Sequence, residues 1–255
     1  MTITINKNKS IGKVLYIVEG NDTEPYLLSK IFNKLFDYQF ERILRGKPYK
    51  KFNSKINPTS RVFVINTESS NIKTINRDNN FLDNLFAELI ENYDFNIDNA
   101  TIFYLFDRDC KSNTDKEFIK NMLGILKNSR ENEDYNRQGL LLISYPSIES
   151  FTLSNFRNNS FLYKVDIGDN LKKLLDNEKI NQSKISLESL SFATKELINS
   201  FKLMNIYSFD VDDFCSTNVQ IFDYEEDLYA NENVYQALSL ICLSLIDLGL
   251  IEIKD

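Results

Sequence analysis

Acidic side chains follow three separate apolar segments of the chain. Glu19 follows VLYIV, Asp107 and Asp109 follow TIFYLF, and Glu149 lies five residues after LLLIS. Two aspartates separated by one residue point to the same side of an extended segment, so Asp107 and Asp109 can face one cation. Carboxylate oxygens are the ligands of hard cations such as Mg²⁺ or Mn²⁺, which promote phosphoryl transfer by neutralising charge on phosphate oxygens. The residue types therefore predict a carboxylate metal site that acts on phosphate esters.

A single acid after a strand has a simpler explanation as a solvated turn residue or as the N-cap of the next helix. Asp22 and Thr23, for example, can cap a helix that opens at Glu24-Pro25. Three acidic strand ends in one short chain are harder to explain as caps, and together they favour a functional site. Gly20, directly after Glu19, leaves room for a phosphate or for backbone to approach.

Histidine is absent from the chain, which narrows the chemistry that it can perform. This absence excludes Ser-His-Asp and Cys-His nucleophile systems and His-rich transition-metal sites. The three cysteines are too few and too scattered for a disulfide framework or a zinc ribbon. Hydrolytic chemistry would have to depend on carboxylates, lysine, tyrosine or hydroxyl groups.

The net charge of -7 argues against a protein that coats nucleic acid nonspecifically. One segment is nevertheless basic and aromatic, and contains no acid. Its charged residues include Arg42, Arg45, Lys47, Lys50 and Lys51, with Tyr49 and Phe52 among them. We expect this segment to contact a nucleic-acid backbone, with stacking from the aromatic rings, although a solvated basic loop is an equally good explanation.

The elements that must position these residues follow an α/β pattern. Short apolar runs alternate with amphipathic stretches, as in βα units around a parallel sheet flanked by helices. Strands are predicted at residues 14–18, 61–65, 101–106 and 140–144, with the first and third at the centre. Helices are predicted between them at residues 23–36, 79–93 and 115–126. The carboxyl ends of such strands form the edge at which ligands bind.

After Pro146 the pattern changes to helices without strands, predicted at residues 147–155, 169–175, 187–207 and 231–248. This change suggests a sheet domain at residues 1–156 and a mostly helical C-terminal region at residues 157–255. No segment reaches the apolar length of a membrane span, and the N-terminus lacks the apolar core of a signal peptide. We therefore expect a soluble, cytoplasmic protein that does not enter a membrane.

Three sequence blocks resemble the Toprim family of nucleases. The apolar strand followed by Glu-Gly, in VLYIVEG, and the later strand that ends in Asp-x-Asp, in IFYLFDRD, match the Toprim pattern. EGNDTEP is similar to a segment of the RloB-like and OLD-like branches, and SYPSIESFTL is similar to a segment of RloB-like proteins. The resemblance covers residues 14–153, and departs from those branches at Tyr26, Ile148 and Phe151.

The resemblance implies a Rossmann-like fold and Mg²⁺-dependent (or Mn²⁺-dependent) cleavage of DNA or RNA. It assigns the catalytic glutamate to Glu19, the metal-binding pair to Asp107 and Asp109, and an additional acidic ligand to Glu149. It also implies a role in prokaryotic antiviral defence with a separate ATPase partner. The chain has no Gly-rich phosphate loop, so we do not expect it to be an ATPase itself. The alternative is a noncatalytic, Toprim-like regulatory protein that holds a partner, for which the acidic C-terminal region is one candidate surface.

Overall fold

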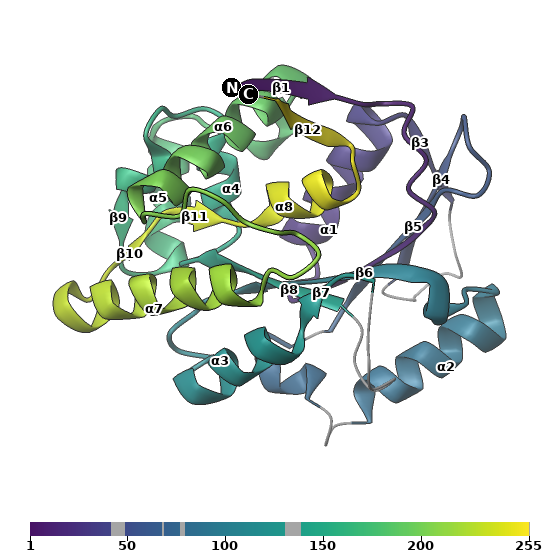
Figure 1. The fold of residues 1–255 in the computed structure, drawn as a ribbon, viewed down its shortest axis with the longest axis horizontal. Coiled ribbons are helices and arrows are strands. Elements are labelled where there is room, and N and C mark those ends of the chain that lie inside the picture. The colour runs from purple at the N-terminus through teal and green to yellow at the C-terminus, as the bar shows by residue number, and fades with distance from the viewer. Residues whose placement is uncertain (42–48, 68, 77–79, 131–138, 255) are drawn as a thin grey trace.

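The centre of the protein is a mixed, mostly parallel β-sheet flanked by helices (Figure 1). The computed structural model describes residues 1–41, 49–67, 69–76, 80–130 and 139–254. The four predicted strands lie side by side and run parallel: β2 (Lys13–Val18), β5 (Arg61–Asn66), β6 (Ala100–Asp107) and β8 (Gly139–Tyr145). Their side chains are almost all buried, because helices cover both faces, and this explains their continuous apolar sequences. The α/β class and the central position of β2 and β6 are confirmed.

The sequence pattern predicts a parallel sheet, whereas the observed sheet is mixed. Its order is β11-β8-β6-β2-β5-β4-β3, and β7 pairs with β8 off this path. The added strands are antiparallel to their neighbours: β3 (Tyr38–Glu41), β4 (Tyr49–Ser54), β7 (Lys127–Asn128) and β11 (Leu238–Ser239). Strand β4 forms where a basic loop was one of the expectations, because Phe52 is fully buried against the rings of Phe32 and Phe40.

The order of the parallel strands creates a switch point between β2 and β6. From β2 the chain continues to β5 on one side, and it then returns to place β6 on the other side. In open α/β sheets of this order, the crevice outside the carboxyl ends of the two switch-point strands is the usual ligand site. Glu19 and Asp107 lie at those two strand ends.

Helices cover the two faces of the sheet (Figure 1). Helix α1 (Thr23–Ser29) continues into the π-helical stretch η1 (Lys30–Leu35), and both lie above the sheet in this view with α4 (Glu149–Ser154). Helices α2 (Phe81–Tyr93) and α3 (Lys116–Ile125) lie below it. These elements confirm the predicted helices to within a few residues.

Helices also predominate after residue 157. They are α5 (Gly168–Asn177), α6 (Leu187–Leu203), α7 (Cys215–Glu232) and α8 (Ile241–Asp247). The single helix predicted at 231–248 is wrong. Asn233 adopts the left-handed conformation that ends α7, and the chain then forms β10 (Tyr235–Gln236) and β11 before α8 begins. The segment is buried on all sides, so its apolar sequence carries no period that separates a strand from a helix.

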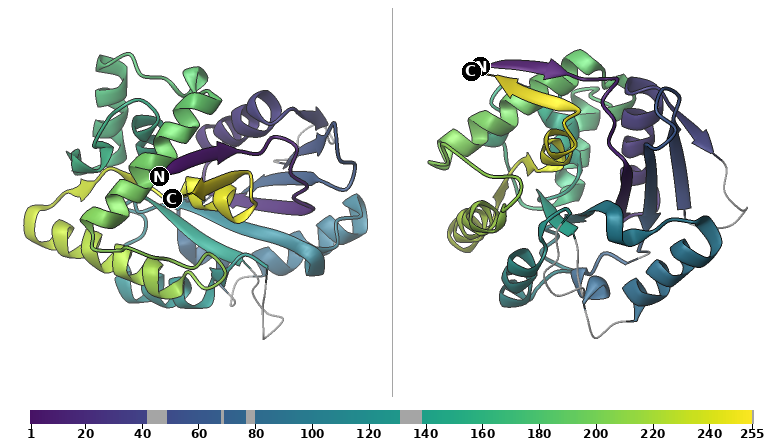
Figure 2. Two further views of the ribbon diagram at one scale, coloured as in Figure 1. Left: turned by 45° about the horizontal axis from the view of Figure 1, so that its top comes forward. Right: turned by 45° about the vertical axis from the view of Figure 1, so that its right-hand side comes forward.

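The two ends of the described chain meet on one face of the molecule (Figure 2). Strand β1 (Thr2–Ile5) pairs antiparallel with β12 (Ile251–Lys254), and Thr2 lies opposite Lys254. One hydrophobic core includes residues from both sides of the expected boundary at residue 157. Within the described ranges, no helix has the length and apolarity to cross a membrane.

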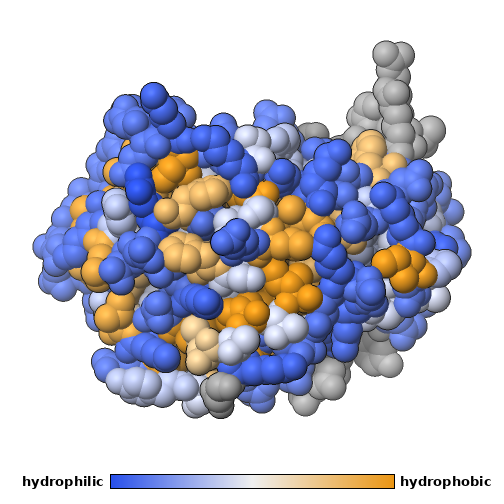
Figure 3. Space-filling model, turned by 90° about the horizontal axis from the view of Figure 1, so that it is seen from above, coloured by the Kyte–Doolittle hydropathy of each residue, from blue (hydrophilic) through white to orange (hydrophobic). Residues whose placement is uncertain are grey.

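The face that carries the termini has an apolar centre (Figure 3). Hydrophobic side chains gather in the middle of this face and hydrophilic ones surround them. Ile3 and Ile5 of β1 are only partly buried, and they pack against the core. The β1–β12 pair is therefore a partial cover over the core.

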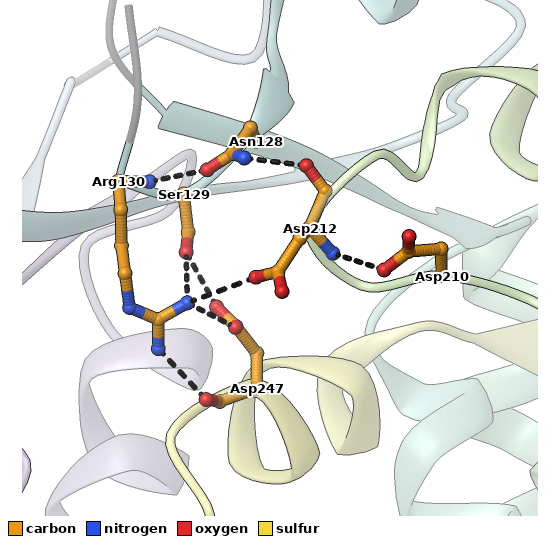
Figure 4. A network of polar contacts seen from close by, with 6 residues as sticks. All are labelled: Asn128, Ser129, Arg130, Asp210, Asp212 and Asp247. Atoms are coloured by element: carbon orange, nitrogen blue, oxygen red, sulfur yellow. Dashed lines mark hydrogen bonds and ion pairs between the residues drawn. The ribbon is translucent and has the colours of Figure 1, made fainter.

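A polar network ties α8 to the sheet (Figure 4). The Asp247 carboxylate accepts hydrogen bonds from Ser129 and Arg130, and Arg130 Nη2 also donates to the Asp247 carbonyl at 2.7 Å. Asn128 donates to the Asp212 carbonyl, and Arg130 Nη1 lies 3.8 Å from Asp212 Oδ1. The network joins the end of β7 to two separate segments of the C-terminal region.

Candidate metal centre at the carboxyl edge of the sheet

Glu19 and Asp107 meet at the switch point of the sheet. The ladder between β2 and β6 continues past the strand ends, where the Glu19 amide donates to the Leu105 carbonyl at 3.2 Å. In return, the Asp107 amide donates to Glu19 Oε2 at 2.8 Å. This bond fixes one oxygen of the glutamate beside the backbone of the aspartate, so the two predicted residues are brought together.

Asp109 lies in the turn that follows β6, and its carboxylate accepts hydrogen bonds from other residues of that turn. Oδ1 accepts from the Lys111 amide at 2.9 Å, and Oδ2 accepts from the Ser112 hydroxyl at 2.8 Å. Its negative charge still reaches Glu19, because it helps to raise the pKa of that residue. Asp109 is thus at the edge of the cluster, and its two oxygens are already hydrogen-bonded.

Glu149 enters the site from the first turn of α4, after the cis Tyr145–Pro146 peptide. Glu149 is 8% exposed, and its Oε2 accepts from the Ser147 hydroxyl at 2.7 Å. The backbone amide of Ile148 lies near Asp107 and acts to lower the pKa of Asp107, against the larger effect of burial. The loop after β8 therefore supplies both a carboxylate and a backbone donor to the same place.

Glu24 is a further member of the cluster that the sequence analysis did not include among the site residues. It lies in the first turn of α1 and is only 5% exposed. A Cβ atom at Gly20 would lie 2.5 Å from Glu24 Oε2, so the glycine permits this close approach. The signal in the sequence was the spacing Glu-Gly-x-x-x-Glu, in which the second glutamate opens a helix.

The carboxylates raise one another's pKa values. Burial is the largest cause for Glu19, and with the charges of Glu24, Asp109 and Glu149 it raises the pKa of Glu19 to about 8, against the hydrogen bond from Asp107. Burial and then the charge of Glu19 raise the pKa of Asp107 well above its usual value. Burial, and next the charge of Glu149, also raise the pKa of Glu24. A group of buried acids that repel one another would gain from a bound cation.

Little positive charge from the protein balances this cluster. In the part of the chain that the structure describes, Lys172 of α5 forms an ion pair with the cluster, and its Nζ lies 3.8 Å from Glu149 Oε1. Its side chain is 55% exposed, so it is not locked against the acids. Helix α5 nevertheless packs closely here, because a Cβ at Gly168 would lie 2.9 Å from Ser147 Oγ.

The predicted nucleic-acid contacts are placed only in part. Arg42, Arg45 and Lys47 lie outside the described residues. Lys51 pairs with Glu41 at 2.9 Å, and its ammonium group lies over the Phe63 ring. Its contacts are therefore with neighbouring strands of the sheet. Lys50 is half-buried near Asp22, and burial lowers its pKa. Lys50 therefore lies near the loop after β2.

The donor set suits a hard divalent cation in its chemistry, because all its donors are carboxylate oxygens and the acids are short of counter-charge. The side chains are not arranged around an ion as they stand. Among residues 1–41, 49–67, 69–76, 80–130 and 139–254, no group of three or more Asp, Glu or Cys side chains has the geometry to hold a metal ion. The acids lie together at one edge of the sheet, and ligation would require some of their side chains to turn.

The chain was compared with protein-family models, with curated proteins and with solved structures. None of the three comparisons found a match.

Proposed function

We propose that this protein is a divalent-cation-dependent nuclease of the Toprim type, which cleaves phosphodiester bonds in DNA or RNA. The observation that carries the proposal is the position of the acidic cluster. Glu19, Asp107 and Glu149 come from three parallel strands or the loops after them, and they meet at the switch point of the sheet. The charge balance supports the same conclusion, because these carboxylates in their ionised form would repel a phosphate unless a cation lay between them.

Glu19 and Asp107 would hold the cation, with Glu149 and Asp109 as further carboxylate ligands. When bound there, Mg²⁺ or Mn²⁺ would supply positive charge to the phosphate group of the substrate. The hydrogen bond from Asp107 fixes Glu19 Oε2, so we expect Oε1 to exchange a proton. Burial and the neighbouring acids raise the pKa of metal-free Glu19 to about 8, and a bound cation would favour its ionised form, in which it can act as a ligand or as a general base.

The proposal extends to a partner. Between Lys202 and Lys254 the chain contains Asp and Glu but neither Lys nor Arg. Such a segment suits a basic protein surface, and the Toprim resemblance implies a separate ATPase in antiviral defence as that partner.

Cleavage assays test the nuclease proposal directly. Wild-type protein is incubated with single- and double-stranded DNA and RNA in the presence of Mg²⁺ or Mn²⁺, with and without EDTA. Glu19→Gln and Asp107→Asn should abolish cleavage while the circular dichroism spectrum stays unchanged. Glu91→Gln, an exposed change on α2, is the matched control and should cleave as the wild type does. Full cleavage by both site variants would end the assignment.

A noncatalytic regulatory protein is the second candidate. The observation in its favour is that no described group of carboxylates is arranged for a metal ion as the side chains stand. Turnover of nucleic acid by the purified protein at catalytic ratios would eliminate this candidate. Binding of a partner that is unchanged by Glu19→Gln and Asp107→Asn, with no cleavage, would support it.

A further inference from the structure

Arg108 separates the two aspartates of the Asp-Arg-Asp segment, and its side chain is almost completely buried. It is 2% exposed, although a buried guanidinium needs compensation for its lost hydration. Arg108 lies between the last residue of β6, Asp107, and Asp109 in the following turn, and its side chain points toward helix α7. The contacts that Arg108 makes inside the protein therefore bear on the segment that carries the proposed ligands.

The counter-charge for Arg108 comes from helix α7. Glu226 Oε1 accepts from Arg108 Nε, and Lys116 Nζ lies 2.8 Å from Glu226 Oε2. The rings of Phe222 and Tyr235 lie on the guanidinium, each with its centroid 5.7 Å from Cζ. The acid-rich α7 is thus connected by one buried ion pair to the centre of the Asp-Arg-Asp segment.

Asn113 closes the other side of this arrangement. Arg108 Nη1 donates to the Asn113 carbonyl at 2.7 Å, while Asn113 Nδ2 donates to the Asp107 carbonyl at 3.2 Å and to the Ser70 carbonyl at 2.9 Å. The Ile72 amide donates to Asn113 Oδ1 at 2.8 Å. The Arg108 amide also donates to the Ser144 carbonyl at 2.8 Å. The turn after β6 is therefore held at its backbone and by two buried side chains.

We infer that Glu226 and Asn113 are positioning residues, which act through Arg108 and the Asp107 carbonyl to hold Asp107 and Asp109 at the metal centre. This inference rests on the proposed function, since it assigns these residues to the same site. Groups that orient metal ligands typically change metal affinity or activity 10- to 100-fold when they are replaced. Helix α7, which the sequence pattern did not predict, would then be part of the site.

Mn²⁺ binding measured by electron paramagnetic resonance provides a test that does not depend on cleavage. Glu226→Ala and Asn113→Ala should each weaken Mn²⁺ binding by about 10-fold or more in folded protein. Glu226→Gln keeps an acceptor for Arg108, so it should fold even where Glu226→Ala does not and should show a smaller loss. Glu232→Ala is the matched control, because Glu232 lies on the same helix in a half-exposed pair with Lys164, and it should bind Mn²⁺ as the wild type does.

The outcomes separate the two proposals. Tight binding by the wild type with unchanged affinity in folded Glu226→Gln and Asn113→Ala would overturn the positioning inference and leave the metal centre standing. Absence of Mn²⁺ binding in the wild type would overturn both. A loss in the two positioning variants, with none in Glu232→Ala, supports both.

Discussion

The hydroxyl of Tyr16, in the middle of the central strand β2, donates a 2.9 Å hydrogen bond to Ser244 Oγ of helix α8. Both side chains are fully buried, and Ser244 in turn donates to the Ile241 carbonyl at 2.8 Å. The central strand of the sheet is thus hydrogen-bonded to a helix 228 residues away in the chain. The C-terminal region is joined to the sheet by polar as well as apolar contacts.

This bond predicts coupling between Tyr16 and Ser244. Ser244→Ala leaves the Tyr16 hydroxyl buried without this acceptor, and we expect it to lower the free energy of unfolding by about 1 to 3 kcal/mol. In a double-mutant cycle measured by urea unfolding, adding Tyr16→Phe should recover part of this loss. Strict additivity of the two changes would show that the bond contributes nothing.

A divalent cation should stabilise the wild-type protein and not its site variants. Mg²⁺ or Mn²⁺ at 100 times its dissociation constant would add about 2.7 kcal/mol, which corresponds to several degrees in Tm. Glu19→Gln and Asp107→Asn should lose this shift. Without metal they should be at least as stable as the wild type, because each removes one of several carboxylates that repel one another. Differential scanning fluorimetry with EDTA as the metal-free reference measures both effects, and an equal shift in all variants would contradict the site.

The buried Glu225 should make stability fall as pH rises. Burial raises its pKa from 4.5 to about 8 in the folded protein, where Oε2 accepts from the Gln236 amide. Between these values the folded state binds a proton that the unfolded state has lost. The free energy of unfolding therefore decreases with pH in this window, by up to about 1.4 kcal/mol per unit. Below the window both states are protonated, and above it both are ionised.

Glu225→Gln tests this pH dependence, because glutamine stays neutral throughout. The variant should show a slope that is smaller by about one proton between pH 5 and pH 8, and it should gain stability relative to the wild type at the alkaline end. Urea unfolding at a series of pH values provides the measurement. The exposed change Glu91→Gln should leave the slope unaltered, and an unaltered slope in Glu225→Gln itself would refute the assignment.

The network around Asp247 predicts a large cost for its removal. The Asp247 side chain is 1% exposed and accepts from Ser129 and Arg130, so Asp247→Ala leaves buried donors without a partner. We expect a loss of about 1 to 3 kcal/mol, discounted because Arg130 is partly exposed. Asp210→Asn is the control, since Asp210 is exposed and an amide oxygen can still accept from the Asp212 amide. Equal unfolding midpoints in urea for both variants would contradict the role of the network.

The sequence predicted the parallel strands well because a strand that is buried on both faces has a continuous apolar sequence. Val14 to Val18 and Ile102 to Phe106 are uninterrupted apolar runs, and each is followed by an acid. Helix α7 has no comparable apolar signal in its sequence, because its buried residues include Glu225 and Glu226 and its composition is acidic. Local periodicity assigns such residues to solvent, and only the distant partners of these residues explain their burial.

The candidate site was predicted to a similar degree. Glu19, Asp107 and Glu149 are found together because strand ends meet at one edge of a parallel sheet. The pairing of Arg108 with Glu226 joins residues 118 positions apart and has no signal in either local segment. The burial of Glu24 depends on a contact with Gly20 that spacing alone suggests but does not establish.

The antiparallel pair of β1 and β12 has a consequence for how the protein acquires its structure during synthesis. Asn6, at the end of β1, bonds with Gly249, which is 243 residues further along the chain. Strand β1 therefore cannot pair until β12 has been synthesised, whereas the βα units between them can fold earlier. Until translation reaches β12, the edge of β1 stays open to other strands, and a ribosome stalled before that point would release a chain prone to aggregate.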